Sequence, residues 1–539
     1  MSKAMALILA LALGLRLYGI GFGLPALNDP DELMFELGAI RMISHHTLNP
    51  GWFGHPATTT MYVLAVINGA VLGFGRLMGW FPSIKAFAEA VYLDPGWIIL
   101  PGRWAMAVFG VGTVWATQRL ATRLFDRQIG LLAALLLAVN PVAVMWSQVV
   151  RSDIMASFFM LLAIDQALKV ARGAGWRDLA WGAAWLALAI ASKWPFGIAG
   201  LAMAAAIVMA ARRSAADGRT PGALRNGAVR LAGFCLLSLA CLLIISPYLL
   251  LAHDTVLRNL RGEAQWHHLG ATGGTPLWNA WWYVRMPLLR ATGWVAGLFA
   301  IAGVAMMARR REAGWLLLPP MAGFAIATCI QHLIWERWAL AWMPMLAMAA
   351  ALAMAGLARR IGQRDPRLLL AGMALLAAGP LVVADGVQAR ERLNDTRQRA
   401  SRWAMAHLAP NAHVLIEHFA FDLLPQPWHL LFPLGQAGCI DARAILKGRV
   451  DYATIESDRA GQANVDYGTM APARAGDCRP DVAILTQYDR YKAERNEFPT
   501  EYQAYVRLLS QGRIVASFTP EPGESGGPVV RIVQFAQRR

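Results

Sequence analysis

The stretch Asn28-Asp29-Pro30-Asp31-Glu32 places three carboxylates shortly after a run of apolar residues, Met5 to Phe22. That run is about as long as a membrane-spanning helix, and it lacks the small-residue cleavage site of a signal peptide. We therefore expect a retained first span with the acidic stretch at its outer mouth. Charged side chains at such a position are costly to keep, so they usually serve a function.

The composition predicts a polytopic α-helical membrane protein. Of the 539 residues, 57% are hydrophobic and 16% charged, 21 are Trp, and the mean hydropathy is +0.40. Residues 387 to 539 hold nearly equal numbers of basic and acidic side chains, so most of the net charge of +16 belongs to the apolar part. Such an excess indicates membrane topology rather than nucleic-acid binding.

Basic clusters between the apolar runs mark cytoplasmic turns and predict about eleven spans, with additional interfacial helices. The chain starts inside at Lys3 and must be inside again by Arg119, so one intervening run has to stay out of the bilayer. We expect the run from 58 to 80, opened by His55-Pro56, to lie along the membrane surface. The acidic stretch and the C-terminal part then share the outer face of a multi-pass protein in the cytoplasmic (inner) membrane.

Two domains are predicted, a transmembrane domain over 1–386 and a small extracytoplasmic α/β domain over 387–539. A polar helix from about 388 to 408 is expected to open the second domain. Short β-rich runs follow at 413–416, 481–485, 513–518 and 529–535. Cys439 and Cys478 lie in this domain, and outside the cytoplasm they could form a disulfide.

The acidic stretch offers candidate catalytic groups in Asp31 and Glu32, with Asp29 beside them. A carboxylate at a membrane mouth can accept the proton of an attacking hydroxyl, while its neighbour orients a sugar or helps to hold a divalent cation. The alternative is a helix N-terminus whose acidic residues complement the helix dipole. Arg151-Ser152-Asp153, on the same face, could bind a substrate hydroxyl or fix an active-site arginine; the alternative is a local ion pair between Arg151 and Asp153.

Five cations are expected at outer span ends, where the charge rule disfavours them: Lys193, Arg285, Arg290, Arg337 and, more weakly, Arg103. An anionic partner such as the phosphate of a lipid headgroup explains them together, because arginine matches phosphate oxygens well. Snorkelling to the interface is the alternative. His55 and the other outer histidines have no zinc-type spacing, so no metal site is assigned.

An ordered series of short motifs resembles the GT-C membrane glycosyltransferases, the group that contains protein O-mannosyltransferases and the aminoarabinose transferase acting on lipid A. The series consists of Asp31-Glu32, Gly54-His55-Pro56, Gly73-Phe74-Gly75, Arg103, Arg151-Ser152-Asp153, Ser192-Lys193, Tyr283-Val284-Arg285-Met286-Pro287, and Arg337-Trp338-Ala339-Leu340-Ala341-Trp342-Met343-Pro344. It extends over most of residues 5 to 357.

The resemblance implies an inverting transfer of a hexosyl or pentosyl group from a polyprenyl-phosphate donor in the membrane lipid to a glycan, lipid or protein acceptor on the outer face. Asp31 would be the base, and Glu32 and Asp153 would position sugar or acceptor. The donor phosphate would be bound by Lys193, Arg285, Arg337 and Arg103, and further substrate contacts would come from Asp29, His55 and Arg151. No cofactor is assigned, and a divalent cation is left open.

Two other functions remain as alternatives. A transporter or flippase of a lipid-linked anionic substrate would also use outward cations, but transporters place charges near the bilayer midplane and often carry repeated halves. Here the charges fall at span ends and no repeat is visible, which favours an enzyme. The third possibility is a non-catalytic protein whose C-terminal domain recruits partners.

Overall fold

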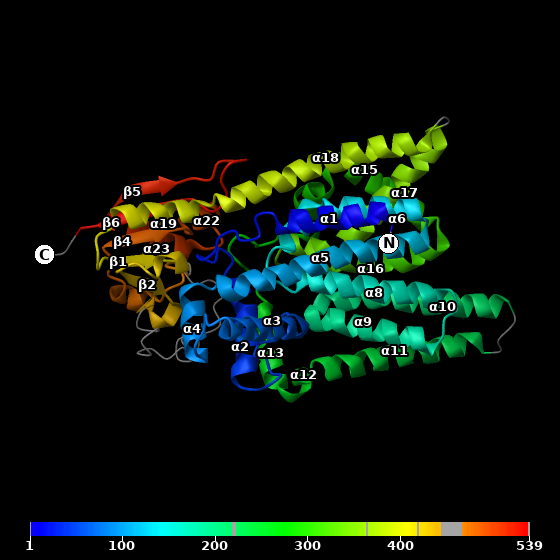
Figure 1. The fold of residues 1–539 in the computed structure, drawn as a ribbon, viewed down its shortest axis with the longest axis horizontal. Helices are drawn as coiled ribbons and strands as arrows, with labels where there is room; N and C mark the ends of the chain where they lie inside the picture. The colour runs from blue at the N-terminus through cyan, green and yellow to red at the C-terminus, as the bar shows by residue number, and fades with distance from the viewer. Residues whose placement is uncertain (1, 218–221, 363–364, 418–419, 443–465, 537–539) are drawn as a thin grey trace.

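The computed structural model describes residues 2–217, 222–362, 365–417, 420–442 and 466–536. A long helical bundle occupies most of the molecule, and a smaller domain built on a β-sheet lies at one end of it (Figure 1). This arrangement confirms the predicted fold class.

Each of the eleven apolar runs predicted as spans contains a helix, but the run from 129 to 147 is divided at Asn140 into two shorter helices. These helices are α1 (Lys3–Leu17), α5 (Gly96–Leu124), α6 (Arg127–Ala138), α8 (Asp153–Ala171), α9 (Trp176–Ser192), α10 (Gly200–Ala216), α11 (Ala223–Ile245), α15 (Leu289–Ala308), α16 (Arg311–Cys329), α17 (Met343–Ile361) and α18 (Pro366–Leu393). Among the described residues, eight helical stretches are long and apolar enough to cross a membrane, α3 being one of them. The protein is therefore a multi-pass membrane protein.

Helix α17 packs against α15 and α6 and consists largely of buried alanine and methionine. Small residues let helix backbones approach closely where no water drives association. At Gly303 of α15, an added Cβ would lie 1.9 Å from the carbonyl oxygen of Ala349 in α17. The two helices therefore cross in backbone contact, and this position requires glycine.

Short helices gather at the end of the bundle that faces the sheet domain (Figure 1). They are α2 (Asp31–Ser44), α3 (Thr58–Leu77), α4 (Ile84–Leu93), α7 (Pro141–Trp146), α12 (Tyr248–Leu251), α13 (His253–Glu263), α14 (Pro276–Tyr283), η1 (Trp194–Ala199), η2 (Val284–Leu288) and η3 (Glu336–Ala341). Helix α3 packs on α2 and begins where α9 ends, because Pro56 and Lys193 form a β-bridge. Its predicted course along the membrane surface remains a prediction, since α3 is also long enough to span.

The sheet of the second domain has the strand order β3-β2-β1-β4-β6-β5 in the described part of the chain. Its strands are β1 (His413–Ile416), β2 (His429–Pro433), β3 (Cys439–Asp441), β4 (Val482–Leu485), β5 (Gly512–Phe518) and β6 (Val530–Phe535). Strand β1 runs parallel to β2 and β4, and the remaining pairs are antiparallel. The four predicted strand runs are confirmed as β1, β4, β5 and β6, whereas β2 and β3 were not predicted.

Helices α19 (Thr396–His407), α22 (Tyr488–Ala493) and α23 (Pro499–Ser510) complete the sheet domain. The single helix expected over 388–408 is two helices, because α18 continues from the bundle to Leu393 and α19 begins after a break (Figure 1). The proposed domain boundary at 386 thus falls inside α18. Cys439 and Cys478 form the expected disulfide, with their Cα atoms 5.1 Å apart.

Candidate active site

Arg151 brings the acidic stretch together at the sheet-domain end of the bundle. Its Nη2 lies 2.9 Å from Asp29 Oδ1 and 2.7 Å from Asp31 Oδ2. Asp29 also accepts a hydrogen bond from the backbone N–H of Asp31 at the start of α2. The Arg151 side chain is 6% exposed and that of Asp31 is 45% exposed. Arg151 thus pairs with Asp31 from the interior, and the Asp31 carboxylate remains open to a ligand.

A second ion pair joins Lys193, at the C-terminal end of α9, to Asp153, the first residue of α8. Both side chains are buried. The loop before α3 fixes this turn, since Trp194 donates its N–H to the carbonyl of His55 at 2.9 Å. The local ion pair between Arg151 and Asp153 that the sequence suggested as an alternative does not form; each residue pairs with a different segment.

Arg337 is the third buried cation of the site and belongs to η3. Its guanidinium carbon lies 4.1 Å from the ring centre of Trp335 and 6.0 Å from that of Trp146. Its Nε is buried and has no hydrogen-bond partner in the described part of the chain. The adjacent Glu336 pairs instead with Arg290, 2.6 Å away, so Arg337 keeps donor capacity for a ligand.

Lys193, Asp153 and Arg337 line a cavity of about 460 Å³, whereas Asp29, Asp31 and Arg151 are not among its lining residues. Its polar end is formed by His55, Asp153, Lys193 and Arg337. Its other walls are largely apolar and include Phe196, Phe324, Leu333, Trp338 and Ala341. The cavity therefore suits an amphiphile with an anionic head and an apolar chain.

The electrostatics keep the carboxylate and the cations charged at neutral pH. Arg151 is the main reason that the pKa of Asp31 lies well below its usual range. Burial lowers the pKa of Lys193 to about 8, and Asp153 opposes that shift. Burial and the charge of Lys193 lower the pKa of His55, so this imidazole is neutral. Its Nδ1 is buried without a hydrogen-bond partner among the described residues and remains available to a substrate hydroxyl.

Glu32 and Arg103 require a correction, because both were expected to contact substrate. They form a fully buried ion pair, with Arg103 Nη2 2.6 Å from Glu32 Oε2. Arg103 also donates to the carbonyls of Ile20 and Phe22, and Glu32 accepts from the N–H of Val150. These contacts satisfy both groups and join the first loop to α5. Neither is free to bind a sugar or a phosphate.

Arg285 requires a similar correction. It lies exposed on η2 and does not line the cavity that holds Lys193 and Arg337. Among the described residues no ion pair involves it. The structure thus brings Lys193 and Arg337 together, and it leaves Arg285 and Arg103 outside the site for opposite reasons, exposure and complete burial.

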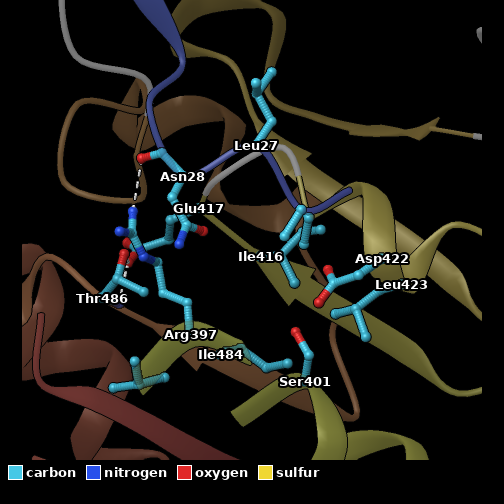
Figure 2. A pocket seen from close by; sticks show the side chains of 13 residues that line it. Leu27, Asn28, Arg397, Ser401, Ile416, Glu417, Asp422, Leu423, Ile484 and Thr486 are labelled. Atoms are coloured by element: carbon cyan, nitrogen blue, oxygen red, sulfur yellow. Dashed lines mark hydrogen bonds between the residues drawn. The ribbon is translucent and has the colours of Figure 1, made fainter. Parts of the chain in front are cut away.

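The sequence did not indicate that the sheet domain holds the first loop. Asn28 exchanges two amide hydrogen bonds with Gln398 of α19, each 2.9 Å long, and its carbonyl accepts from Arg397 at 2.8 Å. Figure 2 shows Asn28 and Arg397 beside Glu417 and Thr486 at a small pocket of about 40 Å³ between the two domains. A contact between residues so far apart in the chain leaves no local sequence signal.

Two aromatic residues and one acidic residue of the site were also missed, namely Trp146, Trp335 and Glu263. Glu263 ends α13, lines the cavity, and has its Oε2 3.8 Å from Nε2 of His55. Both tryptophans contact Arg337, but only Trp335 could have been suspected from the Trp335-Glu336-Arg337 sequence. A tryptophan in a membrane protein is ordinarily assigned to the interface, so that signal is weak.

A divalent cation does not fit the donor set. Within the described ranges, no group of three or more His, Cys, Asp and Glu side chains could hold a metal ion. The carboxylates of Asp29 and Asp31 are paired with Arg151, and that of Asp153 with Lys193. A cation would have to displace these partners.

Comparison with known families and structures relates this fold to known proteins. Residues 95–251 match the model of the dolichyl-phosphate-mannose-protein mannosyltransferase family. The chain has no match among curated protein sequences.

Two solved structures of ArnT from Cupriavidus metallidurans are similar over nearly the whole length. The apo form is 14% identical with a TM-score of 0.55, covering 98% of this chain and 97% of ArnT. The form bound to undecaprenyl phosphate is 14% identical with a TM-score of 0.54, covering 99% and 98%. An oligosaccharyltransferase of Archaeoglobus fulgidus is 12% identical with a TM-score of 0.50, covering 100% and 74%. The chain is therefore a membrane protein with the GT-C glycosyltransferase fold, as its sequence resemblance indicated.

Proposed function

We propose that the protein is an inverting glycosyltransferase that moves a hexosyl or pentosyl group from a polyprenyl-phosphate donor to an acceptor hydroxyl on the outer face of the cytoplasmic membrane. One observation carries the proposal: a single cavity joins the buried cations Lys193 and Arg337 to an apolar wall. A soluble nucleotide sugar has no apolar chain that would contact such a wall. Of the two predicted domains, 1–386 supplies the residues that line this cavity, and 387–539 contacts the first loop through Gln398 and Asn28.

The donor fits the cavity in one orientation. Its phosphate contacts Lys193 and Arg337, which supply a point charge and a planar fork of donors. Its prenyl chain lies along Phe196 and Phe324. The similar ArnT structure that contains undecaprenyl phosphate supports a ligand of this class.

The proposed reaction is a displacement at the anomeric carbon of the sugar. The acceptor oxygen forms a bond to that carbon on the face opposite the phosphate, and the bond from carbon to phosphate oxygen breaks with its electron pair. Asp31 hydrogen-bonds the attacking hydroxyl and takes its proton as the new bond forms. Lys193 and Arg337 stabilise the charge that develops on the departing polyprenyl phosphate.

The remaining polar groups hold these reactants in place. Arg151 positions the carboxylates of Asp29 and Asp31, and Asp153 positions Lys193. The neutral His55 donates to or accepts from a sugar hydroxyl through its unpartnered Nδ1. Groups locked by such contacts lose little entropy when substrate binds, which favours a well-aligned attack.

Undecaprenyl phosphate, the expected type of product, provides a direct test. Native mass spectrometry of the purified protein in detergent should detect its binding, and Lys193→Gln and Arg337→Gln should each weaken it. Equal binding by wild type and both variants would contradict the proposed donor site. In membranes supplied with a labelled polyprenyl-phosphate sugar, label should move to an acceptor. A flippase would leave the label on the lipid, so intact donor on the opposite leaflet would favour that alternative.

A further inference from the structure

A second, larger hollow borders the donor cavity. It has a volume of about 900 Å³ and lies between the segment from Gln265 to His267 and the sheet domain. On the sheet-domain side its walls include Tyr467 and, from α23, Glu501 and Arg507. We refer to it as the sheet-domain groove.

The groove lies near the carboxyl edge of the parallel strands. Tyr467 lines it and donates its backbone N–H to Glu417, the residue that follows β1. Glu417 also accepts from the N–H of Thr486, which follows β4, at 2.6 Å. In open α/β sheets, ligands bind beyond the carboxyl ends of parallel strands, between neighbouring strands whose connections leave in opposite directions. Strand β1 lies between the parallel strands β2 and β4, so its carboxyl end is a position of this kind.

The groove and the donor cavity share a wall. Gln265 and Trp266 line both of them. The Trp266 ring lies 3.9 Å, centre to centre, from that of His332, which lines the donor cavity. A molecule in the groove can therefore extend toward the donor cavity.

The chemistry of the groove selects a polar, uncharged ligand. Three glutamines line it, Gln265, Gln436 and Gln511, and each amide both donates and accepts hydrogen bonds, as sugar hydroxyls do. Glu501 and Arg507 contribute opposite charges, so the lining attracts neither a strongly anionic nor a strongly cationic ligand. The lining also includes apolar residues, among them Met470, Pro472 and Ala504.

Trp266 provides the apolar surface that a sugar ring needs. Its side chain is 65% exposed at the boundary between the two hollows. Amphipathic aromatic rings combine a large contact area with a polar N–H, and they suit ligands with one apolar and one polar face. A pyranose or furanose ring has such faces.

From this arrangement we propose that the sheet-domain groove binds the acceptor and that the acceptor is an uncharged oligosaccharide. The inference rests on the proposed transferase function and adds the acceptor class to it. The new bond would then join the transferred sugar to a hydroxyl of another sugar. No cofactor or further reactant is needed, because the polyprenyl phosphate is the leaving group.

The test uses membranes that contain the full chain, native acceptor and a labelled polyprenyl-phosphate sugar. The double variant Gln436→Ala/Gln511→Ala should raise the acceptor concentration needed for half-maximal transfer by about thirtyfold, since each amide hydrogen bond contributes about 1 kcal/mol. Its binding of undecaprenyl phosphate should stay unchanged, because neither residue lines the donor cavity. Arg513→Ala, exposed on β5 outside the groove, is the matched control.

Mass spectrometry of the labelled product then identifies the receiving group. A sugar-to-sugar linkage together with the altered acceptor dependence supports the inference. Label on an amino-acid side chain or a lipid alcohol overturns it, and so does a double variant that behaves like Arg513→Ala. Failure of the wild type to transfer label or to bind undecaprenyl phosphate would instead contradict the proposed transferase function. The acceptor role of the groove would then also lose its basis.

Discussion

Asp31 and Glu32 are neighbours in the chain, yet they meet opposite environments. Glu32 is fully buried, and its ion pair with Arg103 leaves neither partner available to a ligand. Asp31 is 45% exposed and held on one side by Arg151, whose Nη1 has no hydrogen-bond partner within the described ranges. The difference shows that two adjacent carboxylates, equally acidic in sequence, divide into one that stabilises the fold and one that is open to chemistry.

The largest expected effect is on the rate of sugar transfer, and it tests the role of Asp31. Asp31→Asn should lower the rate of sugar transfer by about a thousandfold, within the range of 10²–10⁴ typical of general acid–base groups. The folded protein and its binding of undecaprenyl phosphate should persist, because the amide preserves size and the phosphate contacts lie elsewhere. Single-turnover transfer in membranes measures the rate. A variant with the wild-type rate would remove Asp31 from the mechanism.

The buried partner should act on stability instead. Arg103→Met removes the charge that Glu32 faces and should cost about 3–5 kcal/mol of unfolding free energy, as expected when one member of a buried pair is lost. Thermal unfolding in detergent checks this. Lys85→Ala is the control, because its pair with Glu89 is exposed, with N–O 4.0 Å, and such pairs contribute little. A loss of activity without loss of stability in Arg103→Met would contradict the assignment.

A second comparison concerns two arginines that looked alike in the sequence. Arg337→Gln should weaken undecaprenyl phosphate binding by about ten- to a hundredfold, the range of one or two hydrogen bonds to a charged group. Arg285→Gln should leave it unchanged, since Arg285 is exposed outside the cavity. Titration of both variants with the same lipid decides the point. Equal losses of affinity in the two variants would show that Arg337 and Arg285 both bind the lipid phosphate.

The smallest effect is a dependence on pH. Because the pKa of Lys193 is lowered to about 8 by burial, its ammonium is charged below that pH and becomes neutral above it. Affinity for undecaprenyl phosphate should therefore fall by less than about tenfold between pH 7 and pH 9, the cost of one partly screened charge. Lys193→Arg should lose this dependence, since arginine stays protonated. A wild-type affinity that is flat over this range would contradict it.

Much of the fold was predictable because hydrophobicity alone places helices in a membrane. Every apolar run expected to span became helical, although the run from 129 to 147 divides into α6 and α7, and the β-rich runs became β1, β4, β5 and β6. Strand β2, His429–Pro433, was missed because its short apolar segment ends in a proline and does not alternate between apolar and polar residues. Strand β3 has only three residues and depends on pairing with β2, which no local pattern reports.

The site was predictable in its residue types and less so in its pairings. Charges that violate the topology rule identified Lys193 and Arg337, and the acidic stretch identified Asp31. The sequence could not tell that Arg103 faces Glu32, because that contact joins segments far apart in the chain. It could not tell that Arg285 stays exposed either, because a charge at a span end faces solvent or cavity depending on how its helix is rotated in the bundle.

The two hydrogen bonds between Asn28 and Gln398 have a consequence for evolution and engineering. Gln398 of α19 hydrogen-bonds Asn28, the residue next to Asp29. We therefore expect that the sheet domain cannot be exchanged between relatives as an independent module. A chimaera would need to carry residues 23–32 from the same parent as its sheet domain, or the grafted domain would leave Asp31 misaligned. The two segments should therefore be inherited as a pair.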